Sequence, residues 1–298
     1  MLITDPADTR LDDFRDLTHA DRRPDRPGGR GLVIAEGVPV VERLIASRYP
    51  VRAIMGVESK IAALQGKCDA PAYAVPVEVM DEVVGFHLNR GVLACADRAP
   101  MPSFAELIGS ATRLLVLEGV GDHENLGALF RNAAAFGIDG VVLGPGCSDP
   151  LYRRAVRVSM GNVLRVPFCS IGTNPSPRPA ESSARSAHPV AVSARSAHPA
   201  EASARSAHPA EVGWPQALHD LRAEGFEVLA MTPYPPAVRL AALDTEMPRV
   251  AVLVGAEGPG LTADALGAAS RNVRIPMADG VDSLNVATAA AIALAHFA

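Results

Sequence analysis

Polar residues that could bind a ligand or move a proton gather in three short segments of this chain. The first segment, Asn125 to Ala133, reads Asn-Leu-Gly-Ala-Leu-Phe-Arg-Asn-Ala. Residues of a helix follow each other at about 100°, so Arg131 lies roughly 140° from the apolar Leu126. Arg131 is therefore either a solvated surface charge or a group that binds phosphate or a developing negative charge. Asn125 is a natural N-cap for this helix.

The second segment is Gly255-Ala-Glu-Gly-Pro-Gly-Leu261, directly after an apolar run. Its three glycines allow a tight turn and a close approach of backbone to a ligand. The segment contains neither the G-x-G-x-x-G fingerprint nor the Gly-Lys-Ser/Thr of a P-loop. Glu257 is a lone carboxylate, which either serves the site or bonds to nearby N–H groups of the turn.

The third segment joins Ile275-Pro-Met277 to Ser283-Leu-Asn285-Val, near the last residues of the chain. Asp282 or Ser283 can cap the helix that is predicted to follow. That helix is apolar nearly all round, which is typical of a buried helix. Burial against a partner subunit is a natural solution for such a helix.

Strands and helices alternate along the chain from residue 113, and the three segments lie next to predicted strands. Such alternation predicts a mostly parallel sheet with helices on both faces. Ligands bind to such sheets at the carboxyl ends of the strands. The predicted strands are 114–120, 141–144, 227–233, 250–255 and 273–277, and the helices are 126–136, 153–160, 215–224, one after Thr262 and one from Ser283.

A smaller alternating α/β unit is predicted at residues 31–96, followed by a Pro-rich linker at 97–103 and the larger unit at 104–298. Residues 1–30 are polar, with arginines matched by aspartates, and are expected to form an N-terminal extension. The motif Ser-Ala-Arg-Ser-Ala-His-Pro occurs three times with a period of ten. Because it has no large apolar residue, about 172–211 is expected to be a low-complexity insertion.

Bulk composition narrows the function classes. A hydrophobic fraction of 48% supports sizeable cores, and a net charge of −5 argues against a general nucleic-acid binder. The four cysteines include no C-x-x-C pair, so no metal site is predicted. With neither an apolar leader nor a membrane-spanning run, the protein is expected to be cytoplasmic, with no membrane partner.

Three motifs follow one another along the chain: Asn-x-Gly-x-x-x-Arg, Gly-x-Glu-Gly-x-Gly-Leu, and Ile-Pro-Met with Ser-Leu-Asn-Val. In this order they resemble the motifs of the SpoU/TrmH RNA 2′-O-ribose methyltransferases, of the SPOUT superfamily. The resemblance covers residues 113–298 apart from the repeats. Residues 31–96 are similar, less strongly, to the ribosomal-protein-like RNA-binding domain that often precedes that catalytic domain. The resemblance implies a trefoil knot in the larger unit and a homodimer with the site near the subunit interface.

The same resemblance implies S-adenosylmethionine as methyl donor and RNA as substrate, with ribosomal RNA favoured over transfer RNA. The donor would be held at Gly255, Ile275, Met277 and Leu284. The catalytic set would be Arg131 with the polar residues that support it, and Ser159 is a weaker match to a recurrent family serine. The supporting residues are Asn125, Glu257, Ser283 and Asn285.

An arginine is essentially always protonated, so Arg131 is expected to bind the phosphate or developing alkoxide rather than to act as a base. Two other functions compete with this one. One is a non-catalytic RNA-binding dimer that retains the knotted domain. The other is a Rossmann-type dehydrogenase, for which neither unit has the fingerprint after its first strand. The sequence names neither the RNA, nor the nucleotide, nor a role for the repeats or for the first 30 residues.

Overall fold

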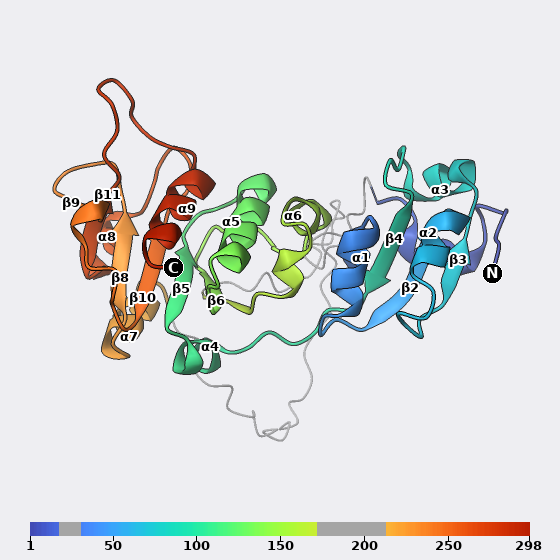
Figure 1. Cartoon of the computed structure of the whole chain (residues 1–298), viewed down its shortest axis with the longest axis horizontal. Coiled ribbons are helices and arrows are strands. Elements are labelled where there is room, and N and C mark those ends of the chain that lie inside the picture. Colours follow the sequence, from blue (N-terminus) through green and yellow to red (C-terminus); the bar gives the residue numbers. More distant parts are fainter. Residues whose placement is uncertain (18–30, 172–212) are drawn as a thin grey trace, which may run out of the picture.

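The computed structural model describes residues 1–17, 31–171 and 213–298, whose strands form two sheets. The smaller sheet lies at the N-terminal end of an elongated molecule, and the larger sheet with its helices fills the rest (Figure 1). The expected insertion and residues 18–30 of the expected extension lie outside the described residues. No helix in the described ranges is both long enough and apolar enough to cross a membrane.

The smaller sheet has four strands in the order β1-β4-β2-β3, with β4 antiparallel to both of its neighbours. Residues of the expected N-terminal extension join its core, since Leu11, Phe14 and Leu17 are buried there around the 3-10 helix Thr9–Phe14. This part of the extension is therefore folded with the sheet. The other elements are β1 (Val33–Glu36), α1 (Val38–Ile45), β2 (Val51–Gly56), α2 (Glu58–Ala63), β3 (Ala72–Ala74), α3 (Val77–Val84) and β4 (Val92–Ala96).

The larger sheet has seven strands in the order β7-β6-β5-β10-β8-β11-β9, and every neighbouring pair is parallel. This confirms the mostly parallel sheet expected from the alternating pattern. The two-residue strand β9 was not foreseen, because two residues are too few to show any periodicity. The strands are β5 (Arg113–Leu117), β6 (Gly140–Leu143), β7 (Phe168–Ser170), β8 (Glu227–Met231), β9 (Val238–Arg239), β10 (Val250–Val254) and β11 (Arg271–Arg274).

Helices cover both faces of this sheet. Leu114 and Val116 of β5 pack with α4, α7 and α8, whereas Leu115 and Leu117 face α5 and α9. Strands buried on both faces read as continuous apolar runs, which explains the sequence of β5 and β10. The helices are α4 (Phe104–Ser110), α5 (His123–Ala135), α6 (Arg153–Val158), α7 (Gln216–Ala223), α8 (Ala263–Ala268) and α9 (Val286–His296), with 3-10 turns at Asn162–Leu164 and Leu240–Ala242.

Ion pairs join the two sheets. Glu36, at the end of β1, is buried and its Oε2 lies 3.3 Å from Nη1 of Arg153 on α6. The Arg98 guanidinium pairs with Asp149, with Nη1 and Oδ1 3.3 Å apart. These partly buried contacts fix the smaller sheet against α6 and therefore against the larger unit.

The four cysteines are free, as expected for reduced thiols. Burial raises the pKa of Cys95 and of Cys169 to about 12. Burial also raises the pKa of Cys147 to about 11. At neutral pH these three side chains are thiols rather than the nucleophilic thiolates.

The chain leaves the larger sheet after β7 and returns to it at almost the same place. Ile171 N donates to the Leu143 carbonyl at 2.7 Å. On the return, the Trp214 ring covers the next residue, where a Cβ on Gly144 would lie 2.9 Å from Cζ3 of the indole. Because Ile171 and Trp214, on either side of residues 172–212, contact the adjacent residues Leu143 and Gly144, a short connection can replace the segment between them.

We predict that deleting residues 176–209 leaves the protein at least as stable as the wild type. A shorter loop lowers the entropic cost of closure, here by about 1–2 kcal/mol. Thermal unfolding of the deletion variant, beside a variant with a Gly/Ser segment of the original length, measures the effect. A fall in the unfolding midpoint of the deletion variant alone would show that these residues support the fold.

Candidate active site

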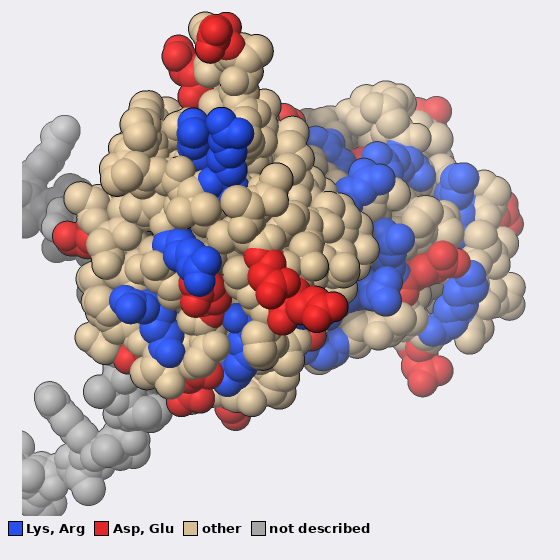
Figure 2. Space-filling view, turned by 60° about the vertical axis from the view of Figure 1, so that its left-hand side comes forward, with Lys and Arg blue, Asp and Glu red and all other residues tan. Residues whose placement is uncertain are grey.

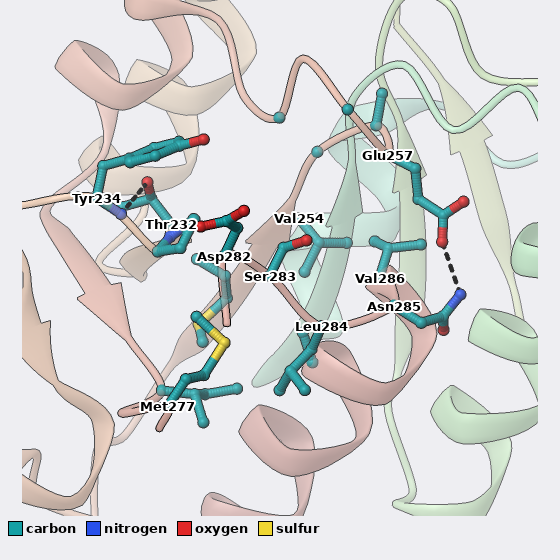
Figure 3. Close-up of a pocket in the computed structure, with 18 of the residues that line it drawn as sticks. Thr232, Tyr234, Val254, Glu257, Met277, Asp282, Ser283, Leu284, Asn285 and Val286 are labelled. Carbon is teal, nitrogen blue, oxygen red and sulfur yellow. Dashed lines mark hydrogen bonds between the residues drawn. The ribbon is translucent and has the colours of Figure 1, made fainter. Parts of the chain in front are cut away.

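A cavity of about 410 Å³ opens at the carboxyl ends of β8, β10 and β11, beside the first turn of α9 (Figure 3). Its position follows from the parallel sheet, in which the carboxyl ends of all strands lie at one edge. The lining residues come from four segments of the chain: Met231–Tyr234, Val254–Gly258 with Gly260, Val273 with Ile275 and Met277, and Asp282–Val286 with Ala289.

The amide of Asn285 joins three segments at this cavity. Its Nδ2 donates to Oδ1 of Asn125 at 2.8 Å and to Oε1 of Glu257 at 2.7 Å. Its Oδ1 accepts from the backbone of Ala287 at 3.0 Å and of Thr288 at 3.2 Å, which caps α9. The structure therefore brings together one residue from each of the three segments that the sequence singled out.

Two expected helix caps are wrong, and both corrections matter for this contact. The N-cap of α5 is Asp122, whose Oδ1 accepts from Glu124 and Asn125 at 2.9 Å each, rather than Asn125. The N-cap of α9 is Asn285, rather than Asp282 or Ser283, and the helix begins at Val286. Relieved of capping, the Asn125 side chain is available to Asn285.

The residues expected to hold the donor line the cavity, as does Ser283. Gly255 is required by a close crossing of the chain, since a Cβ there would lie 2.4 Å from the carbonyl carbon of Gly260. The loop between these two glycines thus folds back tightly and presents Glu257 towards α9. The four residues in which the sequence placed donor binding, and which line the cavity, are Gly255, Ile275, Met277 and Leu284.

Arg131 lies apart from the cavity. It is exposed on α5, is absent from the cavity lining, and makes no hydrogen bond or ion pair within the part of the chain that the structure describes. Ser159 is fully buried, and its Oγ donates to the Val156 carbonyl at 3.0 Å, so its contacts are those of a structural residue. Neither residue meets the asparagine contact within one chain.

Asn132 lies in the first motif, and no role was predicted for it. Its Nδ2 donates to the Ala287 carbonyl at 2.8 Å and holds α5 against the first turn of α9. Asn125 and Asn132 are seven residues apart and therefore lie on one face of α5, two turns apart. That spacing was a signal in the sequence that two amides face the same neighbour.

Thr232 and Tyr234 also line the cavity and were missed. They follow β8 directly, so the rule that ligands bind at the carboxyl ends of strands would have found them. Asp282, considered only as a cap, lines the cavity as well. In Figure 3 its carboxylate lies on the side of Thr232 and Tyr234, away from Glu257.

The charged side chains that line the cavity are negative. Glu257 and Asp282 are its ionisable acids, and no Lys, Arg or His stands among the described residues that line it. Fixed carboxylates favour a cationic ligand and repel phosphate groups. The cavity is therefore better suited to a positively charged small molecule than to a nucleotide phosphate.

We predict that Asn285→Ala lowers the free energy of unfolding by about 1 kcal/mol more than Asn285→Asp does. Both changes remove the donor to Asn125 and Glu257, but aspartate still caps α9. Urea unfolding compares the two variants. Equal losses would contradict the capping role, and adding Glu257→Gln to Asn285→Asp tests whether repulsion between two carboxylates has masked it.

Comparison with known proteins gives the family. The SpoU rRNA methylase family model matches residues 112–193 and 185–295. The chain is 49% identical over 298 residues to an uncharacterized tRNA/rRNA methyltransferase of Mycobacterium tuberculosis, covering 98% of this chain and 89% of that protein. It is 28% identical over 194 residues to the 23S rRNA (guanosine(2553)-2'-O)-methyltransferase RlmP of Bacillus subtilis, covering 64% and 60%.

Solved structures share the fold. An AdoMet-bound rRNA methyltransferase from Sinorhizobium meliloti has a TM-score of 0.72 at 20% identity, covering 100% of this chain and 97% of that one. The SpoU methyltransferase AviRb from Streptomyces viridochromogenes, in complex with AdoMet, has a TM-score of 0.67 at 16% identity, covering 97% of both chains. Together with the family model and the 49% identity, this confirms the resemblance seen in the motifs: the chain belongs to the SpoU rRNA methylase family.

Proposed function

We propose that this protein transfers a methyl group from S-adenosylmethionine to a ribose 2′-hydroxyl of a structured RNA, ribosomal rather than transfer RNA. The observation that carries the proposal is the Asn285 contact, which joins the three family motifs at one cavity. Relatives support it, since RlmP of Bacillus subtilis is a 2′-O-methyltransferase of 23S rRNA. The choice of ribosomal RNA also rests on the separate N-terminal unit.

The cavity fits the proposed donor. S-adenosylmethionine carries a sulfonium, and the wall has two carboxylates and no cation among its described residues. Gly255, Ile275, Met277 and Leu284 would hold the donor through backbone groups and apolar contact. A dinucleotide such as NAD, with two phosphates, would meet repulsion in the same cavity.

In the transfer, the 2′-oxygen bonds to the methyl carbon as the carbon–sulfur bond breaks, its electron pair stays on sulfur to give S-adenosylhomocysteine, and the hydroxyl proton passes to solvent water. The donor supplies an activated methyl group. The protein must align the hydroxyl with that methyl and stabilise the developing alkoxide. We assign Arg131 to the alkoxide or the adjacent phosphate, and Asn125, Glu257, Ser283 and Asn285 to holding the loops in place around the cavity.

The position of Arg131 outside the cavity bears on whether two chains form a homodimer. Within one chain it lies outside the cavity, and the outer side of α9 leaves Ile292 41% exposed beside Leu284 at 36%. We propose a homodimer that covers this apolar surface and places the site near the subunit interface. We also propose the trefoil knot that the family resemblance implies.

The N-terminal unit is proposed as the RNA-binding domain, within the boundaries 31–96 together with the packed residues before it. Figure 2 shows Lys and Arg side chains on both sides of the view, including the right-hand side, where this unit lies. An acidic chain needs such a local surface to bind RNA. The ion pairs of Glu36 with Arg153 and of Arg98 with Asp149 would keep the bound RNA in register with the cavity.

The competing function, a non-catalytic RNA-binding dimer, is favoured by one observation, the separation of Arg131 from the cavity. Arg131→Ala distinguishes the two. Mapping methylated riboses in cells with and without the gene identifies the RNA for this test. The intact asparagine contact and cavity are the features that an RNA-binding dimer alone would not need.

We predict that Arg131→Ala lowers the single-turnover methylation rate by about 10²-fold or more, as loss of one electrostatic contact to a transition state does. Stability should change by no more than about 0.5 kcal/mol, because the side chain is exposed. Donor affinity, measured by calorimetry, should be unchanged, and Arg131→Lys should rescue poorly because lysine has no planar fork. A variant with wild-type turnover would return Arg131 to a surface charge.

We predict sedimentation at twice the chain mass of 31.1 kDa at micromolar concentration. Ile292→Glu should shift the protein towards monomer, because it places a charge in the proposed interface. Met101→Glu is the matched control, since Met101 is also 41% exposed but lies in the linker. A monomer that methylates RNA at the wild-type rate would refute the dimer.

A further inference from the structure

Glu118 is a buried carboxylate that the proposed mechanism does not use. It follows β5 directly, is 4% exposed, and does not line the cavity. Its Oε1 accepts from Nε1 of Trp214 at 2.7 Å and from Oγ1 of Thr262 at 2.8 Å. Its Oε2 accepts from the backbone N of Thr262 at 2.9 Å. A buried charge with three donors is held in one orientation.

Thr262 is the residue at which the loop after β10 ends. Its Oγ1 donates to Glu118 and accepts from Ala265 N at 3.2 Å, so it also caps α8. The other end of the loop touches the residue after Glu118, where a Cβ on Gly119 would lie 3.1 Å from Cβ of Ala256. The segment 118–119 therefore contacts both ends of the loop that carries Glu257.

Trp214, from a segment distant in sequence from Thr262, also contacts Glu118. It is the second described residue after the expected insertion, and its ring covers Gly144 so closely that a Cβ there would lie 2.9 Å away. The indole N–H is directed to Glu118. The return of the chain from the insertion is thus tied to the same carboxylate as the cavity loop.

We propose that Glu118 is a positioning residue for the loop Gly255–Leu261 and that, with Trp214 and Thr262, it sets the affinity of the cavity for the methyl donor. The inference rests on the proposed function, since it concerns binding of S-adenosylmethionine. Glu118 touches neither the cavity nor the reacting atoms, and it acts through the loop. The loop in turn presents Glu257 to Asn285.

The arrangement needs a carboxylate rather than an amide. Both oxygens of Glu118 face N–H donors that cannot become acceptors, one on Trp214 and one on the backbone of Thr262. In Glu118→Gln, either orientation of the amide sets its NH₂ against one of these donors. A buried donor without an acceptor costs enough to displace the loop.

The test uses the full-length protein and calorimetric titration with S-adenosylmethionine. Glu118→Gln should raise the donor Kd by about tenfold or more. Trp214→Phe keeps the ring and loses the N–H, and Thr262→Val keeps the shape and loses the hydroxyl. Each should raise the Kd by a smaller factor, whereas Thr262→Ser should bind as the wild type does. At saturating donor, methylation by these variants should return to within about threefold of the wild-type rate.

Asp139→Asn is the matched control. Asp139 Oδ2 accepts from Thr112 N at 2.7 Å, Thr112 Oγ1 at 3.0 Å and Arg113 N at 2.9 Å, at the opposite end of β5. It should lower the thermal midpoint and leave the donor Kd unchanged. If Glu118→Gln folds, an unchanged donor Kd in this variant would overturn the inference. If Glu118→Gln does not fold, an unchanged donor Kd in both Trp214→Phe and Thr262→Val would overturn it. A wild-type protein that does not bind the donor would instead overturn the proposed function.

Discussion

The Asn285 side chain has only one orientation open to it, and the site is built around that fact. Its oxygen is committed to two N–H groups at the start of α9, so its NH₂ group must point the other way. The two hydrogens of that group then meet Asn125 and Glu257. Asn285 therefore caps α9 and also joins α5 to the loop that carries Glu257, and each of the two roles fixes the orientation that the other needs.

Both sides of this contact have their own support. Asn132 ties α5 to the first turn of α9, so that Asn125 on the same helix face is held at a fixed distance from Asn285. Glu257 is held by a loop that folds back at Gly255 and is anchored at Thr262 by Glu118. The cavity has few bonded polar groups of its own, and its shape comes from these contacts behind its wall.

The sequence predicted the parallel sheet, the helices on both of its faces and part of the cavity lining, because apolar runs and glycine-rich loops report burial and turns locally. Prediction from the sequence failed where several polar residues could fill the same structural role and only the folded chain selects one of them. Asp122 and Asn125 are both good caps, and only the start of α5 decides between them. Glu118 falls within the predicted strand 114–120, and nothing near it in the sequence indicates its partners, Trp214 and Thr262. Arg131 was predicted from a motif, and a single chain does not show its target.

The contacts of Ile171 and Trp214 with the adjacent residues Leu143 and Gly144 have a practical consequence. A chain whose entry and exit points are neighbours can accept an inserted domain whose own ends are close together. A fluorescent protein grafted between Ile171 and Gly213 would report on the movements of the enzyme on its RNA while both termini remain free.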